Sequence, residues 1–217
     1  MRNCTARPIE RVVIVGCGPG GEEYVTPAAK QAVEEADVVF GAKRVLGLFE
    51  DAQVEKVSIA SPLEDTLAEI EERAGKGQKV AVLVTGDPGL RSLARPVIER
   101  LGRDRCRVVP GVSSVQAAFA AIGISWENAR IVSAHHELPS VTPEDLRAED
   151  RIAVLLGAEY AVEWTADLAR KLSDHRCFVC ENLTLEEERV REVDAEKLAE
   201  IDPPGRTVVI LVRKELL

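Results

Sequence analysis

The first half of the chain alternates short apolar runs with stretches of helical periodicity. This alternation predicts parallel strands joined by crossover helices, which together form a sheet with helices packed on it. The expected strands cover residues 11–15, 37–40, 54–59, 79–84 and 106–109, and the expected helices cover residues 27–36, 63–75, 88–101 and 113–123. Pro96 cannot donate a hydrogen bond inside a helix, so the third of these helices is expected to be kinked or split.

The pattern loosens after Gly123, and a second set of apolar runs begins at Arg130. The expected strands cover residues 130–134, 151–156, 176–181, 188–193 and 206–213, with a helix near residues 159–173 and a short one at residues 195–200. Because only the short helix separates the last three strands, antiparallel pairing is expected there. We therefore predict an α/β protein of two small domains, residues 1–124 with a mostly parallel sheet and residues 125–217 with a mixed sheet.

The first loop, Gly16-Cys17-Gly18-Pro19-Gly20-Gly21, matches the G-x-G-x-x-G fingerprint of dinucleotide-binding proteins. In that fingerprint the helix opens within the glycines, so that its N–H groups meet the pyrophosphate. Here the start signal is Thr26, an N-cap residue followed by proline, so the helix starts too late. Glu22 and Glu23 lie in between and would repel a pyrophosphate. We therefore predict no dinucleotide site, and an NAD(P)-dependent oxidoreductase is kept as the rival from another reaction class.

Ligands of open α/β sheets gather outside the carboxyl ends of the strands, which directs attention to two further loops. The loop at residues 85–89 contains Gly86 and Asp87, and the loop at residues 110–114 contains Ser113. Asp87 before a proline has an ordinary interpretation as a helix N-cap, and Ser113 can cap the next helix. Gly86 is harder to explain in that way, because a glycine there lets backbone approach a ligand closely.

Composition narrows the functional classes. With 217 residues and 46% hydrophobic content, the chain can bury a sizeable core. A net charge of −9 argues against a broad nucleic-acid surface. No apolar run approaches the roughly 18 residues of a membrane helix, and no signal peptide precedes the first strand, so we expect no membrane partner and a cytoplasmic location. Cys177 and Cys180 form a C-x-x-C without a second pair at zinc spacing, so we expect two core thiols in a strand and no metal site.

Four stretches, in this order and spacing, resemble the opening and internal motifs of one family, the tetrapyrrole methylases. They are Val15 to Gly20, Tyr24 to Ala29, Gly86 to Pro88, and Pro110 to Gln116. Three more stretches are similar to one branch, the precorrin methylases of cobalamin biosynthesis that act at C5 of cobalt-precorrin-7. They are Phe40 to Arg44, Ser133 to His136, and Glu181 to Leu183. The second histidine of Ser133-Ala134-His135-His136 stands where the family pattern has a glycine.

The resemblance implies that S-adenosylmethionine binds in a cleft between the two domains. The implied cofactor contacts are Pro19, Gly86, Asp87, Leu90, Ser113, Ser114, Leu156 and Gly157. The candidates for the tetrapyrrole side are Gly18, Lys43, Arg44, Arg91 and His135, and Arg91 is expected to share a helix face with Arg95. A sulfonium already activates the methyl group, so no acid, base or nucleophile is demanded and no catalytic residue is assigned. Proton loss from the ring could involve His135 or a water molecule.

The same resemblance implies C5 methylation of a corrin precursor without decarboxylation, since the chain ends at Leu217 with no room for a second enzyme. A separate decarboxylating C15-methyltransferase would be the functional partner, and a homodimer is expected. Three alternatives stay open beside the oxidoreductase: methylation of another precorrin position, methylation of RNA or of a translation factor, and a noncatalytic ligand-binding module. The acidic charge disfavours RNA.

Overall fold

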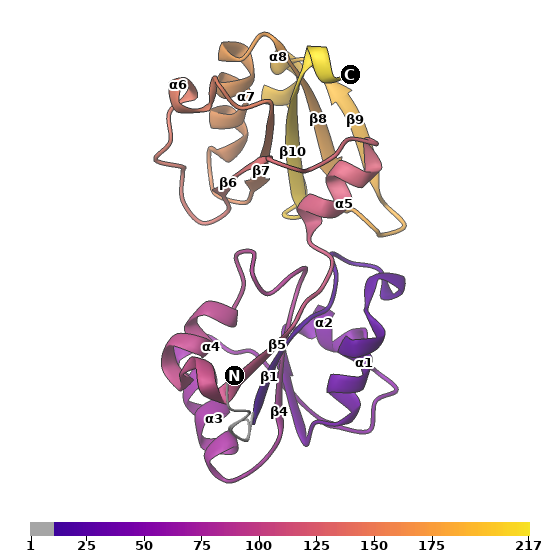
Figure 1. The fold of residues 1–217 in the computed structure, drawn as a ribbon, viewed down its shortest axis with the longest axis vertical. Coiled ribbons are helices and arrows are strands. Elements are labelled where there is room, and N and C mark those ends of the chain that lie inside the picture. The colour runs from indigo at the N-terminus through magenta and orange to yellow at the C-terminus, as the bar shows by residue number, and fades with distance from the viewer. Residues whose placement is uncertain (1–10) are drawn as a thin grey trace, which may run out of the picture. The chain divides into compact units, whose positions relative to one another are not determined.

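The computed structural model describes residues 11–217, which divide into two compact units (Figure 1). The first unit ends at Ser113 and the second begins at Ser114. This division comes before the boundary predicted at residue 124, because helix α5 (Ser114–Ala121) packs against strand β10 (Thr207–Arg213) of the second unit.

The first unit is built on a five-stranded sheet in which every pair is parallel, as predicted. Its strands are β1 (Val12–Gly16), β2 (Val38–Gly41), β3 (Glu55–Ser58), β4 (Val80–Val84) and β5 (Cys106–Val109), in the order β3-β2-β4-β1-β5. Strands β1 and β4 are neighbours in this sheet. The connection from β1 leads toward β2, on one side of the pair, and the connection from β4 leads toward β5, on the other side. In open α/β sheets ligands bind at such a switch point, outside the carboxyl ends of the strands, which directs attention to the loops after β1 and β4.

Helices cover both faces of this sheet (Figure 1). They are α1 (Pro27–Glu34), α2 (Lys43–Gly47), α3 (Leu63–Gly75) and α4 (Ala94–Leu101), with 3₁₀ turns at Glu22–Tyr24 and Arg103–Arg105. Because successive strand residues point to opposite faces, Val12 and Ile14 join the core beneath α3 and α4, whereas Val15 joins the core beneath α1 and α2. The predicted helices at 27–36 and 63–75 are confirmed, and the short helix α2 was not predicted.

The helix predicted at residues 88–101 is shorter than expected, because it begins only at Ala94. Pro96 therefore lies in its first turn, where the backbone N–H groups need no partner within the helix. The proline is accommodated without a kink, and residues 88–93 form a loop instead of a helical turn.

The second unit holds a mixed sheet with the order β6-β7-β10-β8-β9. Its other strands are β6 (Arg130–Ala134), β7 (Arg151–Leu156), β8 (His175–Glu181) and β9 (Arg189–Val193), and its other helices are α6 (Pro143–Leu146), α7 (Ala161–Lys171) and α8 (Ala195–Ala199), followed by a 3₁₀ turn at Lys214–Leu216. The antiparallel pairing predicted among the last three strands is confirmed. Strand β6 is parallel to β7, and β10 is antiparallel to both β7 and β8. The carboxyl ends of β6, β7 and β8 therefore lie on the same side of the sheet.

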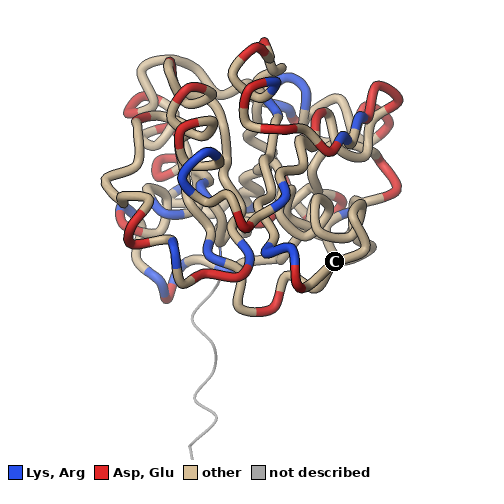
Figure 2. The backbone as a smooth tube through the Cα atoms, turned by 90° about the horizontal axis from the view of Figure 1, so that it is seen from above, with Lys and Arg blue, Asp and Glu red and all other residues tan. Residues whose placement is uncertain are grey.

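The C-x-x-C pair lies in β8, as predicted, and both thiols are buried. Burial raises the pKa of Cys177 and of Cys180 to about 12, so neither thiol ionises near neutral pH. Basic and acidic positions are interspersed along the chain in Figure 2. Between residues 11 and 217, no helix combines the length and the apolar character that crossing a membrane requires.

Candidate functional site

Backbone hydrogen bonds join the first two glycine loops of the first unit. Gly18 and Gly86 form an isolated antiparallel bridge, in which Gly86 N donates to Gly18 O over 2.7 Å. Cys17 N donates to Val84 O over 2.9 Å, which continues the pairing beyond the ends of β1 and β4. Gly18 and Gly86 both have positive φ, at 77° and 69°, a conformation that side-chain-bearing residues rarely adopt. The two loops are therefore one backbone platform at the sheet's switch point.

The third loop reaches this platform by direct contact of backbone with backbone. A Cβ atom added to Gly111 would lie 2.5 Å from Gly86 O and 2.7 Å from the carbonyl carbon of Gly16. A Cβ atom added to Gly16 would lie 2.6 Å from Gly111 N. Each of the three loops thus contributes a glycine to a contact that leaves no room for a methyl group. We call Gly16, Gly86 and Gly111 the glycine contact.

Asp87 fixes the third loop to the second. Its Oδ1 accepts a hydrogen bond from Gly89 N over 2.8 Å, and its Oδ2 accepts one from Gly111 N over 3.1 Å. The interpretation of Asp87 as a helix N-cap is wrong, since no helix begins until Ala94. Its carboxylate instead satisfies backbone donors of two loops, one of them supplied by a residue far away in the sequence.

The late helix start after the first loop is confirmed. Thr26 Oγ1 accepts a hydrogen bond from Ala29 N over 3.1 Å, and α1 begins at Pro27. Between the glycines and α1 lies only the 3₁₀ turn that contains Glu22 and Glu23. No helix dipole is therefore aimed from within the glycine motif, which agrees with the prediction that no dinucleotide lies there.

Two of the predicted cations lie in the short helix α2, directly after β2. Arg44 Nη2 donates to Thr85 Oγ1 over 3.0 Å, so this arginine reaches the residue before Gly86. Thr85 was missed by sequence reasoning, although a polar residue directly after a buried strand was the available signal. The Lys43 side chain forms no hydrogen bond or ion pair with any residue of the described chain.

The expectation that Arg91 and Arg95 share a helix face is wrong. Arg91 lies in the loop before α4 with a φ of 48°, whereas Arg95 lies in α4 and pairs with Glu99 over 2.7 Å. Leu90, the implied donor contact beside Arg91, donates its backbone N–H to Asp87 O over 3.1 Å and so belongs to the loop that Asp87 fixes. Arg91 makes no hydrogen bond or ion pair within residues 11–217, so its guanidinium is available to an outside anion.

In the second unit, three of the predicted residues meet where β6 and β7 end. His135 Nδ1 lies 3.1 Å from Leu156 O, and Ala158 N donates to Ala134 O over 2.8 Å. A Cβ atom at Gly157 would lie 2.3 Å from His135 Nδ1, so the ring occupies space that any other residue at 157 would fill. The Leu156 side chain belongs to the core, and its carbonyl faces the ring.

The remaining predicted residues fall on either side of the division between the units. Pro19 follows Gly18 in the first loop, Ser113 is the last residue of the first unit, and Ser114 begins α5 in the second. Glu181, of the stretch similar to the precorrin branch, lies at the same edge as His135 and is buried, with Oε2 accepting from Arg191 over 2.8 Å. Groups of three or more metal-ligating side chains are absent among the described residues.

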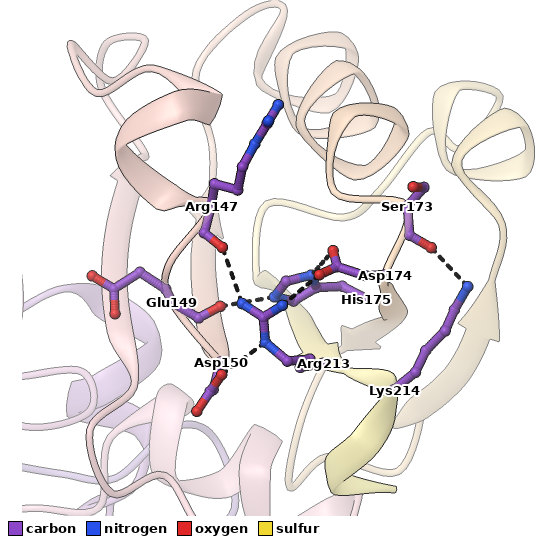
Figure 3. Close-up of polar contacts among 8 residues, drawn as sticks. All are labelled: Arg147, Glu149, Asp150, Ser173, Asp174, His175, Arg213 and Lys214. Atoms are coloured by element: carbon purple, nitrogen blue, oxygen red, sulfur yellow. Dashed lines mark hydrogen bonds and ion pairs between the residues drawn. The ribbon is translucent and has the colours of Figure 1, made fainter.

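The opposite edge of the second sheet holds a structural polar network (Figure 3). The Arg213 guanidinium donates to Asp150 Oδ1 over 2.8 Å, bonds to Asp174, and donates to Arg147 O over 3.0 Å. The buried His175 ring contacts Asp174 Oδ1 and Glu149 O, each over 2.8 Å. The hydrogen bond from His175 lowers the pKa of the Asp174 carboxyl. This network ties the start of β8 to the end of β10 and lies away from the candidate site.

Residues 11–199 match the model of one family, the Tetrapyrrole (Corrin/Porphyrin) Methylases. The chain belongs to this family. Membership makes it a methyltransferase that uses S-adenosylmethionine, as the motifs suggested. This tetrapyrrole methylase is 30% identical to the probable cobalt-precorrin-7 C(5)-methyltransferase of Methanocaldococcus jannaschii, in an alignment that covers 92% of this chain and 96% of that protein.

Solved structures of other tetrapyrrole methylases share the fold. The precorrin-6Y methylase of cobalamin biosynthesis from Archaeoglobus fulgidus is 28% identical, with a TM-score of 0.71 over 94% of this chain and 98% of that one. The uroporphyrin-III C-methyltransferase of Thermus thermophilus, solved with S-adenosylhomocysteine, is 26% identical, with a TM-score of 0.72 over 93% of this chain and 97% of that one. The predicted two-unit α/β architecture is thereby confirmed.

Proposed function

We propose that this tetrapyrrole methylase transfers a methyl group to C5 of cobalt-precorrin-7 in cobalamin biosynthesis. The observation that supports this most is the similarity to the Methanocaldococcus jannaschii protein, which spans both chains nearly end to end. That relative is named for the C5 activity alone. We therefore also propose that C15 methylation with decarboxylation belongs to a separate enzyme, and that this chain acts as a homodimer.

The residues of the candidate site fit a donor that is held largely through backbone groups. The glycine contact brings the backbone of three loops together at the carboxyl ends of β1, β4 and β5. When bound, S-adenosylmethionine supplies a methyl group already activated by its positively charged sulfur. We propose that the donor is contacted by Pro19, Gly86, Asp87, Leu90, Ser113, Ser114, Leu156 and Gly157. Asp87 serves this site by fixing the second and third loops, since both of its oxygens accept backbone N–H groups.

The chain's remaining task is to orient an acceptor that bears many carboxylates. The net charge of the chain, −9, repels such an acceptor. Local cations must therefore attract the substrate, and Lys43 and Arg91 have no competing partner among residues 11–217. We propose Gly18, Lys43, Arg44, Arg91 and His135 as the substrate side of the site. Orientation of two reactants is itself a large source of rate, so these contacts serve catalysis as well as binding.

The test is incubation of the purified chain with S-adenosylmethionine and cobalt-precorrin-7, with the product analysed by mass spectrometry. The expected result is a mass gain of one methyl group without loss of carbon dioxide. Neighbouring pathway intermediates, tested in parallel, should show no gain, and methylation of one of them instead would reassign the substrate. Thermal protection by NADPH but not by S-adenosylmethionine would favour the oxidoreductase and refute the proposal.

A further inference from the structure

His135 is held in one tautomer by its contact with β7. Leu156 O is a carbonyl oxygen and can only accept a hydrogen bond, so the ring nitrogen that faces it over 3.1 Å, Nδ1, must donate and bears the proton. In a neutral imidazole the other nitrogen, Nε2, then has a free lone pair. Nε2 makes no hydrogen bond with any residue of the described chain. The ring is therefore oriented as a base whose accepting atom is unoccupied.

The surroundings of the ring keep this orientation. Gly157 provides the space for Nδ1, since a Cβ atom there would lie 2.3 Å away. The His136 ring packs edge-on against the His135 ring, with centroids 4.6 Å apart. Among residues 11–217, only the His136 ring packs against the His135 ring. Glu137 and Glu159, the carboxylates next along the two elements, form no bond to it.

We propose that His135 Nε2 accepts the proton that the ring carbon releases after methylation. This inference rests on the proposed function, because C5 methylation of a methine carbon requires that proton to leave. The carbon uses an electron pair of its double bond to form the new bond to the methyl carbon, and the electrons of the broken sulfur–methyl bond remain on sulfur. The carbon–hydrogen pair then restores the double bond, and the hydrogen moves as a proton to Nε2. The balance needs no oxidant or further reactant.

Position supports this assignment over a purely structural role for the ring. His135 bonds directly to the main chain of Leu156 and touches Gly157, two of the residues proposed to contact the donor. A general base must lie within hydrogen-bond reach of the proton it takes, and histidine is the side chain most often used. The ends of β6 and β7 thus combine residues proposed to contact S-adenosylmethionine with an oriented proton acceptor.

The test compares His135→Gln with Glu137→Gln in the methyl-transfer assay. Glutamine can still donate to Leu156 O but cannot take up a proton, so kcat should fall by about 10²-fold in His135→Gln while the Kd for S-adenosylmethionine changes less than threefold. Glu137→Gln, a change two residues later at a side chain that forms no bond to the ring, should stay within threefold of the wild type. His135→Ala should regain activity in added imidazole, and the acidic limb of the pH–rate profile should disappear in His135→Gln.

Other outcomes separate the two proposals. If wild-type protein does not methylate cobalt-precorrin-7 at all, the proposed function fails. If wild-type protein is active and His135→Gln is equally fast, only the assignment of the base fails. A weaker donor Kd with unchanged kcat at saturating donor would likewise overturn the assignment, since it would show that the ring only supports the Gly157 loop.

Discussion

Replacing Gly111 by alanine tests whether the glycine contact shapes the donor site. The added Cβ atom would lie 2.5 Å from Gly86 O and 2.8 Å from Gly16 O, whereas ordinary contact begins at 3.4 Å. Both neighbours are backbone atoms, so no side chain can rotate away and the loops must separate by about 0.9 Å, the difference between 3.4 and 2.5 Å. Overpacking of this kind costs about 1–3 kcal/mol. For a chain of this length, that lowers Tm by about 2–12 °C.

The control is Gly75→Ala at the end of α3, where an added Cβ meets nothing within 4 Å. Its Tm should be unchanged or slightly higher, because alanine is favoured over glycine in a helix. Differential scanning calorimetry gives Tm, and isothermal titration gives the Kd for S-adenosylmethionine. Displaced loops lose contacts with the donor, and a loss of about 1.4 kcal/mol raises Kd about tenfold, which is the rise we expect in Gly111→Ala.

The reasoning is refuted if Gly111→Ala melts and binds donor like the wild type. A lower Tm with an unchanged donor Kd would separate the two claims: the three loops would be in contact, but the donor would bind elsewhere.

Three further predictions address single contacts. Lys43→Glu should weaken the binding of the tetrapyrrole and leave the binding of S-adenosylmethionine unchanged. Arg44→Glu, which removes the bond to Thr85, should weaken the binding of both ligands. Equilibrium titrations with each ligand test these two expectations. Asp87→Asn leaves Gly111 N or Gly89 N without its carboxylate acceptor, so the free energy of unfolding should fall by about 1–3 kcal/mol in urea melts, and an unchanged value would contradict the described contacts. Because the folded-state pKa of Asp174 is lowered, its stabilising effect is present above the ordinary value of 3.8 and is lost as pH falls through the folded value. Asp174→Asn should therefore unfold with a weaker acid dependence than the wild type.

The elements that the sequence predicts well are those determined by local signals. The buried central strands such as β4 and β10 follow from apolar runs. The start of α1 follows from Thr26 and Pro27, whose bonds lie within one turn. The same reasoning fails at Asp87, where the motif for a helix start is present but the carboxylate bonds to Gly111, which is distant in sequence. Helix α2 has no side-chain cap and only five residues, so the sequence offers little to detect it.

The candidate site follows the same rule. Family motifs fall on the loops at the carboxyl ends of the strands, but they do not reveal which side-chain atoms already have a partner. Arg91 and Arg95 look alike in a helical pattern, yet only Arg95 lies in a helix and is paired. The orientation of His135 depends on a carbonyl of another strand, and a hydrogen bond between two strands cannot be inferred from the residue types alone.

A junction in which backbone packs directly on backbone constrains evolution in an unusual way. Gly16 and Gly111 must remain without side chains, because an added Cβ atom would meet backbone, and Gly86 holds a positive φ. Asp87, whose carboxylate accepts from Gly111 N, is constrained as well, whereas positions outside these contacts are free to change. Substitutions at other positions, such as Lys43, can therefore change the substrate preference while the junction of the three loops is kept. An engineer who wishes to redirect this enzyme to a different macrocycle should vary those flanking positions and leave the three glycines alone.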